Sequence, residues 1–225
     1  MRFKEFVGEQ QQLDEINLKQ LAAAGIIGAA GLGMGGKSAY ATTPQEQYRI
    51  DMANSIAKHY HIKPEQALEI VDTAHEEGDP VFPKPQDLLA LTGVESSFNP
   101  QAMAKAKRGT QTAKRIRHDT PSGLLQVRPG IWKLPANALA SVKGQIHHGK
   151  EILKYYYKKF HGDKEAAMGA FHMGETDFRK RGIDPTYIQK YYAELERQKQ
   201  ARHAEREVRL RQLHHQAHLQ KTHLK

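Results

Sequence analysis

The stretch LLALTGVESSFNPQA at residues 88–102 runs from an apolar helical pattern into a short polar motif. Leu88, Leu91 and Glu95 occupy positions i, i+3 and i+7, which share one face of an α-helix. Because the first two are apolar, Glu95 is predicted to lie on the buried side of a helix end. A buried glutamate tends to hold its proton, since an ionised carboxylate is costly to remove from water. Such an acid can donate its proton to a glycosidic oxygen. Spacing alone also allows a surface glutamate at a fraying helix end.

Helical periodicity continues on both sides of this stretch. The clearest amphipathic helix spans Val142–Phe160 and ends at the polar turn His161-Gly162-Asp163. Further helices are predicted over residues 48–60, from Pro64 to Gly78, over Glu165–Met173 and around Tyr187–Leu195. No segment shows the alternation of a strand and no internal repeat is present. The predicted fold class is therefore all-α.

The charge of the chain is concentrated in two segments. Its 225 residues contain no cysteine and carry a formal charge of +9. Residues 103–121 hold six Lys or Arg against Asp119, and residues 196–225 hold eight against three glutamates, so each segment contributes +5. The rest of the chain is close to neutral. Such local basicity favours an anionic partner, which can be nucleic acid, a membrane surface or cell wall.

Three motifs follow the glutamate in order. The segment Glu95–Ala102 is succeeded by SGLLQVRP at 122–129, AMGAFHMG at 167–174 and Tyr187-Ile188. This set resembles the catalytic domain of the soluble lytic transglycosylase family, whose motifs run E-S-x-F-x-P-x-A, G-L-x-Q, A-Y-N-x-G and a late Tyr-Val. The resemblance covers roughly residues 45–195. It implies an all-α, lysozyme-like domain that acts on peptidoglycan glycan strands.

The resemblance also assigns roles to individual residues. Glu95 corresponds to the single catalytic carboxylate, which in that family protonates the oxygen between N-acetylmuramic acid and N-acetylglucosamine. The same group then takes the proton of the muramoyl 6-hydroxyl, so that a 1,6-anhydro product forms without water. No cofactor is implied. The positions implied for substrate binding and the cleft lining are Ser96, Gln126, Phe171, His172 and Tyr187.

Two departures from the family pattern leave alternatives open. Phe171 lacks the hydroxyl of the usual tyrosine, and His172 replaces an asparagine with a titratable imidazole. The basic loop of residues 103–121 lengthens the distance between the first two motifs, and its Asp119 is a candidate second carboxylate that would favour hydrolysis. The alternatives are a goose-type-like muramidase, which is a hydrolase, and a non-catalytic protein that binds glycan in a virion or another structure.

The segments outside the motifs suggest a setting at the cell wall. Residues 1–41 are expected to form an arm that contains the uncharged run Leu21–Gly36, and residues 196–225 a basic, His-rich helical tail after a catalytic domain at 42–195. The uncharged run is followed by the A-x-A sequence Ala39-Tyr40-Ala41, as in a signal peptide, but acidic residues precede it. The run and the tail are candidate contacts with a membrane or a virion protein. A virion-associated protein of a phage and a protein exported to the periplasm or cell wall both fit.

The histidines do not predict a metal site. His147-His148 and His214-His215 with His218 lack the H-E-x-x-H arrangement and its carboxylate partners. No metal is therefore expected. Nucleic-acid binding is disfavoured, because the basic tail has no interleaved aromatic residues.

Overall fold

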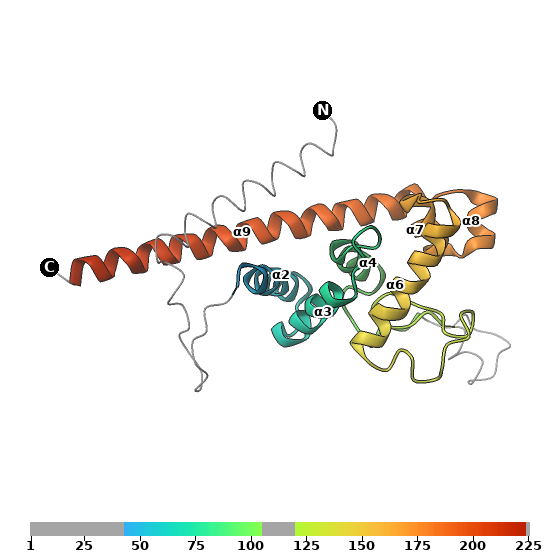
Figure 1. The fold of residues 1–225 in the computed structure, drawn as a ribbon, viewed down its shortest axis with the longest axis horizontal. Coiled ribbons are helices and arrows are strands. Elements are labelled where there is room, and N and C mark those ends of the chain that lie inside the picture. The colour runs from blue at the N-terminus through green and yellow to red at the C-terminus, as the bar shows by residue number, and fades with distance from the viewer. Residues whose placement is uncertain (1–42, 105–119, 224–225) are drawn as a thin grey trace, which may run out of the picture. The chain divides into compact units, whose positions relative to one another are not determined.

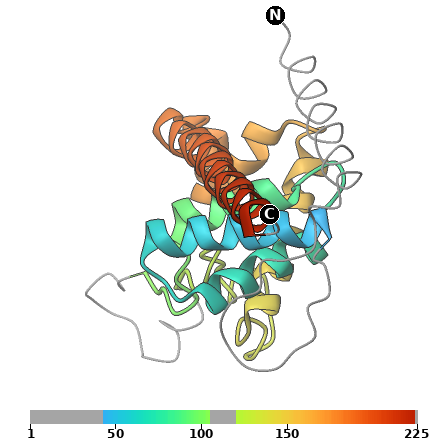
Figure 2. The same cartoon turned by 90° about the vertical axis from the view of Figure 1, so that its left-hand side faces the viewer.

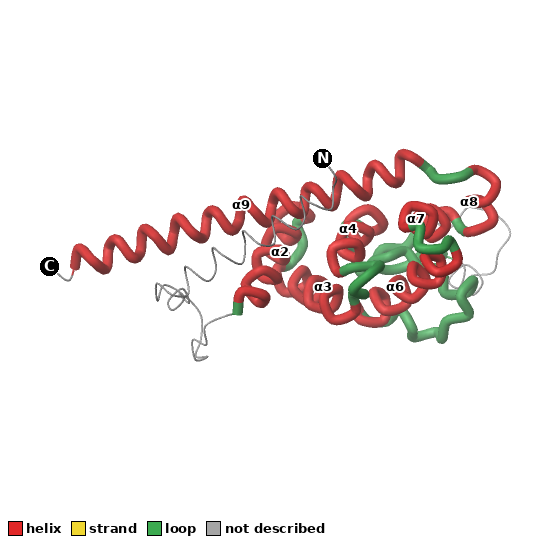
Figure 3. The backbone as a smooth tube through the Cα atoms, turned by 45° about the horizontal axis from the view of Figure 1, so that its top comes forward, coloured by secondary structure: helices red, strands yellow, loops and turns green. Residues whose placement is uncertain are grey.

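The computed structural model describes residues 43–104 and 120–223. Within them the chain forms helices and loops without a strand, apart from isolated bridges that join Ser122 to Met103 and Val127 (Figure 3). The prediction of an all-α fold is confirmed for this part of the chain. Its seven helices are α2 (Pro44–Tyr60), α3 (Pro64–Glu77), α4 (Pro85–Ser96), α6 (Val142–Lys159), α7 (Lys164–Met173), α8 (Glu175–Arg181) and α9 (Pro185–His223).

The motifs lie in one compact unit, Arg49–Arg202. Helix α9 continues without a break past residue 195, where the catalytic domain was predicted to end, and Gln198 is still buried. The predicted arm at residues 1–41 and most of the basic loop, including Asp119, lie outside the described residues. Of the described helices, none combines the length and the apolar character required to cross a membrane.

Local sequence features determine where helix α4 begins and ends. Pro85 occupies its first turn, and the Asp87 carboxylate accepts a hydrogen bond from the Lys84 backbone N–H at 2.8 Å. Leu88 and Leu91 are fully buried, as their spacing predicted. The helix ends at Ser96, and the next residue, Ser97, has a left-handed φ of 54°, so the chain turns away two residues after Glu95.

Helix α6 packs against both α3 and α7 (Figure 1). The side chain of Ser141 caps it by accepting a hydrogen bond from the Gly144 N–H at 3.1 Å. Gly149 permits its close approach to the second motif, because a Cβ added there would lie 2.3 Å from Leu125 Cδ1. The motif loops are therefore packed directly on the helical core.

Candidate active site

Glu95 lies in the last turn of α4, with only 12% of its side chain exposed. Tyr187, in the first turn of α9, donates a hydrogen bond from its hydroxyl to Glu95 Oε1 at 2.6 Å. His172, near the end of α7, places Nδ1 3.6 Å from the same oxygen. Within the described part of the chain both contacts of the carboxyl group fall on Oε1. The second oxygen, Oε2, has no hydrogen-bond or ion-pair partner among the described residues.

His172 and Tyr187 also contact each other. Their rings stack with centroids 3.9 Å apart and planes inclined by 14°. Burial raises the pKa of the Tyr187 hydroxyl well above its ordinary value, and the negative charge of Glu95 adds to the effect. Tyr187 therefore keeps its proton at physiological pH and acts as a donor to the carboxylate. Three helices that are distant in the sequence meet at one carboxyl oxygen.

The comparison with family models identifies the domain that contains these residues. Residues 82–191 match the family model described as Transglycosylase SLT domain. The chain carries a transglycosylase SLT domain. The match begins just before α4 and ends in α9, so it includes all four motifs. Searches of curated proteins and of solved structures gave no significant match.

Ser96 and Gln126 are engaged with the backbone of the SLT domain. The Ser96 hydroxyl donates to the Thr92 carbonyl oxygen at 3.1 Å within α4. Gln126 has a left-handed φ of 48°, and its Nε2 donates to the carbonyl oxygens of Gly123 at 2.8 Å and Ala102 at 3.2 Å. Its amide nitrogen thus ties the second motif to the end of the first. Contact of Gln126 with a sugar stays a prediction.

Phe171 lies on α7 beside His172 and is half-buried. Its ring has no group to donate a hydrogen bond, so at this position the SLT domain cannot hold Glu95 or a substrate as a tyrosine would. The structure brings His172, Tyr187 and Glu95 together without it. Its predicted place in the cleft is untested.

Sequence reasoning missed Gln145, which organises the loops around the site. Its buried side chain accepts from the Leu124 N–H at 2.8 Å and donates to the carbonyl oxygens of Pro100 at 3.1 Å and Leu139 at 2.9 Å. One amide thus links both motif loops to α6. A clue was present in the sequence, because Gln145 shares a helical face with Val142 and Gly149.

The first part of helix α9 passes beside α4 (Figures 1 and 2). A second set of buried polar groups joins the two helices. Tyr191 donates to Asp87 at 2.5 Å, which places tyrosine–carboxylate bonds at both ends of α4. Further along α9, Gln198 Nε2 donates to the Leu89 carbonyl oxygen at 3.2 Å and to Glu194 at 2.6 Å. These contacts fix the helix that carries the candidate acid.

The described side chains form no group of three or more histidine, cysteine and carboxylate residues that could hold a metal ion. Several polar side chains of α6 are instead paired with α3 or the loop that follows it. Glu77 accepts from His147 at 2.9 Å and from Lys150 at 2.8 Å, and Lys154 bonds Asp79 at 2.7 Å. These pairs join helices rather than forming a site.

Proposed function

We propose that this protein cleaves the glycan strands of peptidoglycan as a lytic transglycosylase, with Glu95 as its acid and base. The observation that carries the proposal is the arrangement at Glu95. A shielded carboxyl group has one oxygen held by Tyr187, and its other oxygen has no contact within the described residues. The SLT family match supports the same reaction class.

In the proposed reaction, protonated Glu95 donates its proton to the glycosidic oxygen as the bond from that oxygen to C1 of N-acetylmuramic acid breaks. The N-acetyl carbonyl oxygen of the substrate supports the electron-deficient C1. Ionised Glu95 then takes the proton of the 6-hydroxyl while O6 bonds to C1. The product is a 1,6-anhydro sugar, no water is consumed, and Glu95 ends with its proton restored.

Tyr187 and His172 have different roles at Glu95. The Tyr187 hydroxyl donates to Oε1, so it stabilises the carboxylate formed after the first proton transfer. His172 is 37% exposed and packs on the Tyr187 ring, so it positions that ring. We infer that His172 acts through Tyr187 rather than as a second acid.

Product analysis after digestion of purified murein tests the proposal. Wild-type protein should release fragments that end in 1,6-anhydro-muramic acid, and Glu95→Gln should abolish cleavage. Glu76→Gln, which alters an exposed carboxylate on α3, is the matched control and should leave the products unchanged.

Two other outcomes would replace the proposal. Reducing muramic ends would mark the protein as a muramidase that uses water. Failure of the wild-type protein to cleave murein, combined with retained binding, would mark it as a non-catalytic glycan-binding protein. A wall-opening role in a phage virion or after export stays a prediction from the sequence.

A further inference from the structure

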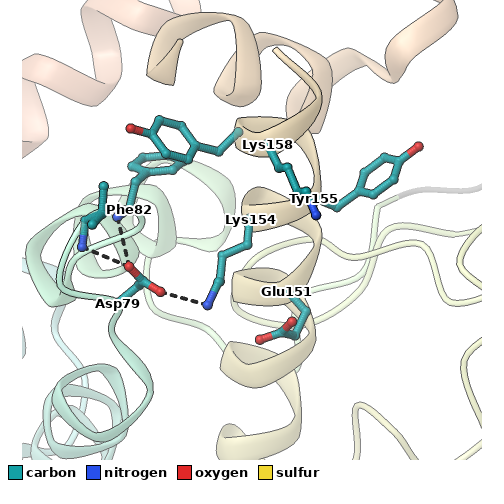
Figure 4. A pocket seen from close by; sticks show the side chains of 8 residues that line it. Asp79, Phe82, Glu151, Lys154, Tyr155 and Lys158 are labelled. Carbon is teal, nitrogen blue, oxygen red and sulfur yellow. Dashed lines mark hydrogen bonds and ion pairs between the residues drawn. The ribbon is translucent and has the colours of Figure 1, made fainter. Parts of the chain in front are cut away.

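A pocket of about 360 Å³ lies across α6, away from Glu95. It is bounded by Asp79, Val81 and Phe82 in the loop before α4, and by the second half of α6 (Figure 4). Phe82 precedes α4 whereas Glu95 lies in its last turn, about 15 Å further along that helix. Glu95 does not line this pocket. The pocket is therefore separate from the candidate active site.

Exposed apolar side chains stand on both sides of the pocket. Val81 is 56% exposed on the loop, and Tyr155 is 46% exposed on α6. In Figure 4, Tyr155 and Phe82 lie to either side of Lys154 and Lys158. Small-molecule pockets are commonly lined by apolar and aromatic side chains together with a few polar groups that orient the ligand.

Tyr155 is held in place despite its exposure. Its hydroxyl accepts a hydrogen bond from Lys159 Nζ at 2.9 Å. The rings of Trp132 and Tyr156 pack edge-on against it, with centroids 5.5 and 5.3 Å away. An exposed aromatic ring that is already immobilised loses little conformational entropy when a ligand covers it.

The charges in the pocket balance. Lys154 is paired with Asp79 at 2.7 Å, and Lys158 and Glu151 supply one further charge of each sign. Such a lining does not favour a polyanion, which requires an excess of cations. It offers donors and acceptors to an uncharged, hydroxyl-rich ligand, whose apolar C–H face can pack on an aromatic ring.

We propose that this pocket, with Tyr155 as its aromatic platform, is a second glycan-binding site that holds an N-acetylhexosamine unit. It would anchor a strand at a distance from Glu95. A volume of about 360 Å³ is at the lower end of the range for small-molecule sites and suits one or two sugar residues. The proposal does not depend on the cleavage reaction, because a glycan-binding protein without catalysis could use the same pocket.

The only tryptophan of the chain provides a local probe, because Trp132 packs against Tyr155. We would titrate the full-length Glu95→Gln variant with a soluble N-acetylglucosamine oligosaccharide and follow Trp132 fluorescence. A saturable change is expected. Tyr155→Ala should weaken the affinity about tenfold, as expected for loss of an aromatic contact, and Tyr155→Phe should retain it. Tyr192→Ala removes a tyrosine of similar exposure, 47%, that does not line the pocket and should leave the affinity unchanged.

Three results would overturn the proposal. They are the absence of a Trp132 response, equal affinity in the parent and in Tyr155→Ala, and a response to polyphosphate but not to the oligosaccharide. If Tyr155→Ala does not fold, Val81→Asp alters the exposed opposite border and should weaken binding similarly. Absent murein cleavage with an intact Trp132 response would refute the enzymatic proposal and leave the second site standing.

Discussion

The hydroxyl of Tyr187 donates a hydrogen bond to Glu95 Oε1 at 2.6 Å, across 92 positions of sequence. The bond joins the first turn of α9 to the last turn of α4. Because both groups are largely shielded from water, a bond to the charged carboxylate is stronger here than at the surface.

Tyr187→Phe tests this bond, since it removes the hydroxyl and keeps the ring that stacks on His172. We expect murein cleavage to fall by about one to two orders of magnitude, because a hydrogen bond to a charged group contributes about 1.5–3 kcal/mol. Anhydro-product release measures the rate. Tyr192→Phe, whose hydroxyl bonds Glu165 at 2.9 Å, is the control. Equal losses in both variants would contradict a specific role for Tyr187.

His172→Asn tests whether the imidazole positions Tyr187. The His172 ring stacks on the Tyr187 ring with centroids 3.9 Å apart. The substitution removes this stacking but leaves the Tyr187 hydroxyl that donates to Glu95. We therefore expect murein cleavage to fall less than in Tyr187→Phe, by no more than about tenfold. A larger loss in His172→Asn than in Tyr187→Phe would contradict a positioning role.

Asp79→Asn tests the ion pair between the α3–α4 loop and α6. The hydrogen bond from Lys154, reinforced by backbone N–H groups, lowers the pKa of Asp79 from 3.8 to about 2. Because this pKa is lower in the folded protein, the ionised Asp79 carboxylate stabilises the fold at pH values above 3.8. That contribution disappears as the pH falls from 3.8 towards about 2.

The Asn variant should be less stable at neutral pH by on the order of 1 kcal/mol. It should also lose less stability than wild type on acidification over that window. Urea unfolding at a series of pH values measures both effects. Asp177→Asn, which removes an exposed pair within α8, should retain the wild-type pH dependence. Parallel acid profiles for Asp79→Asn and wild type would contradict the assignment.

Gly93→Ala tests the close packing of α4 on α9. An added Cβ would lie 2.7 Å from both Glu194 Oε1 and the Tyr60 hydroxyl oxygen. The Glu194 carboxylate cannot move away easily, because Arg197 and Gln198 hold it through hydrogen bonds. We expect a loss of about 1–3 kcal/mol in the free energy of unfolding. Combining the substitution with Glu194→Ala should cost less than the sum of the two single changes, and full additivity would exclude this clash.

The sequence predicted more of the helices than of the contacts between them. The spacing of Leu88 and Leu91 correctly placed α4 and its buried face, because helical periodicity is a local property. The polar residues on α9 are different. Glu194 and Gln198 share one helical face but are not apolar, so periodicity of hydrophobic residues could not identify that face as buried.

For the candidate site too, the sequence predicted the residues but not the contacts between them. The sequence by itself determined the family and selected Glu95, His172 and Tyr187 as candidates, because motif order survives in the linear chain. Only the tertiary structure decided that Tyr187 and His172 meet at the same oxygen of Glu95, and that Gln145 ties the motif loops together. Those contacts depend on how distant helices pack. Packing is set by the fit of side chains across the whole domain and cannot be read from local spacing.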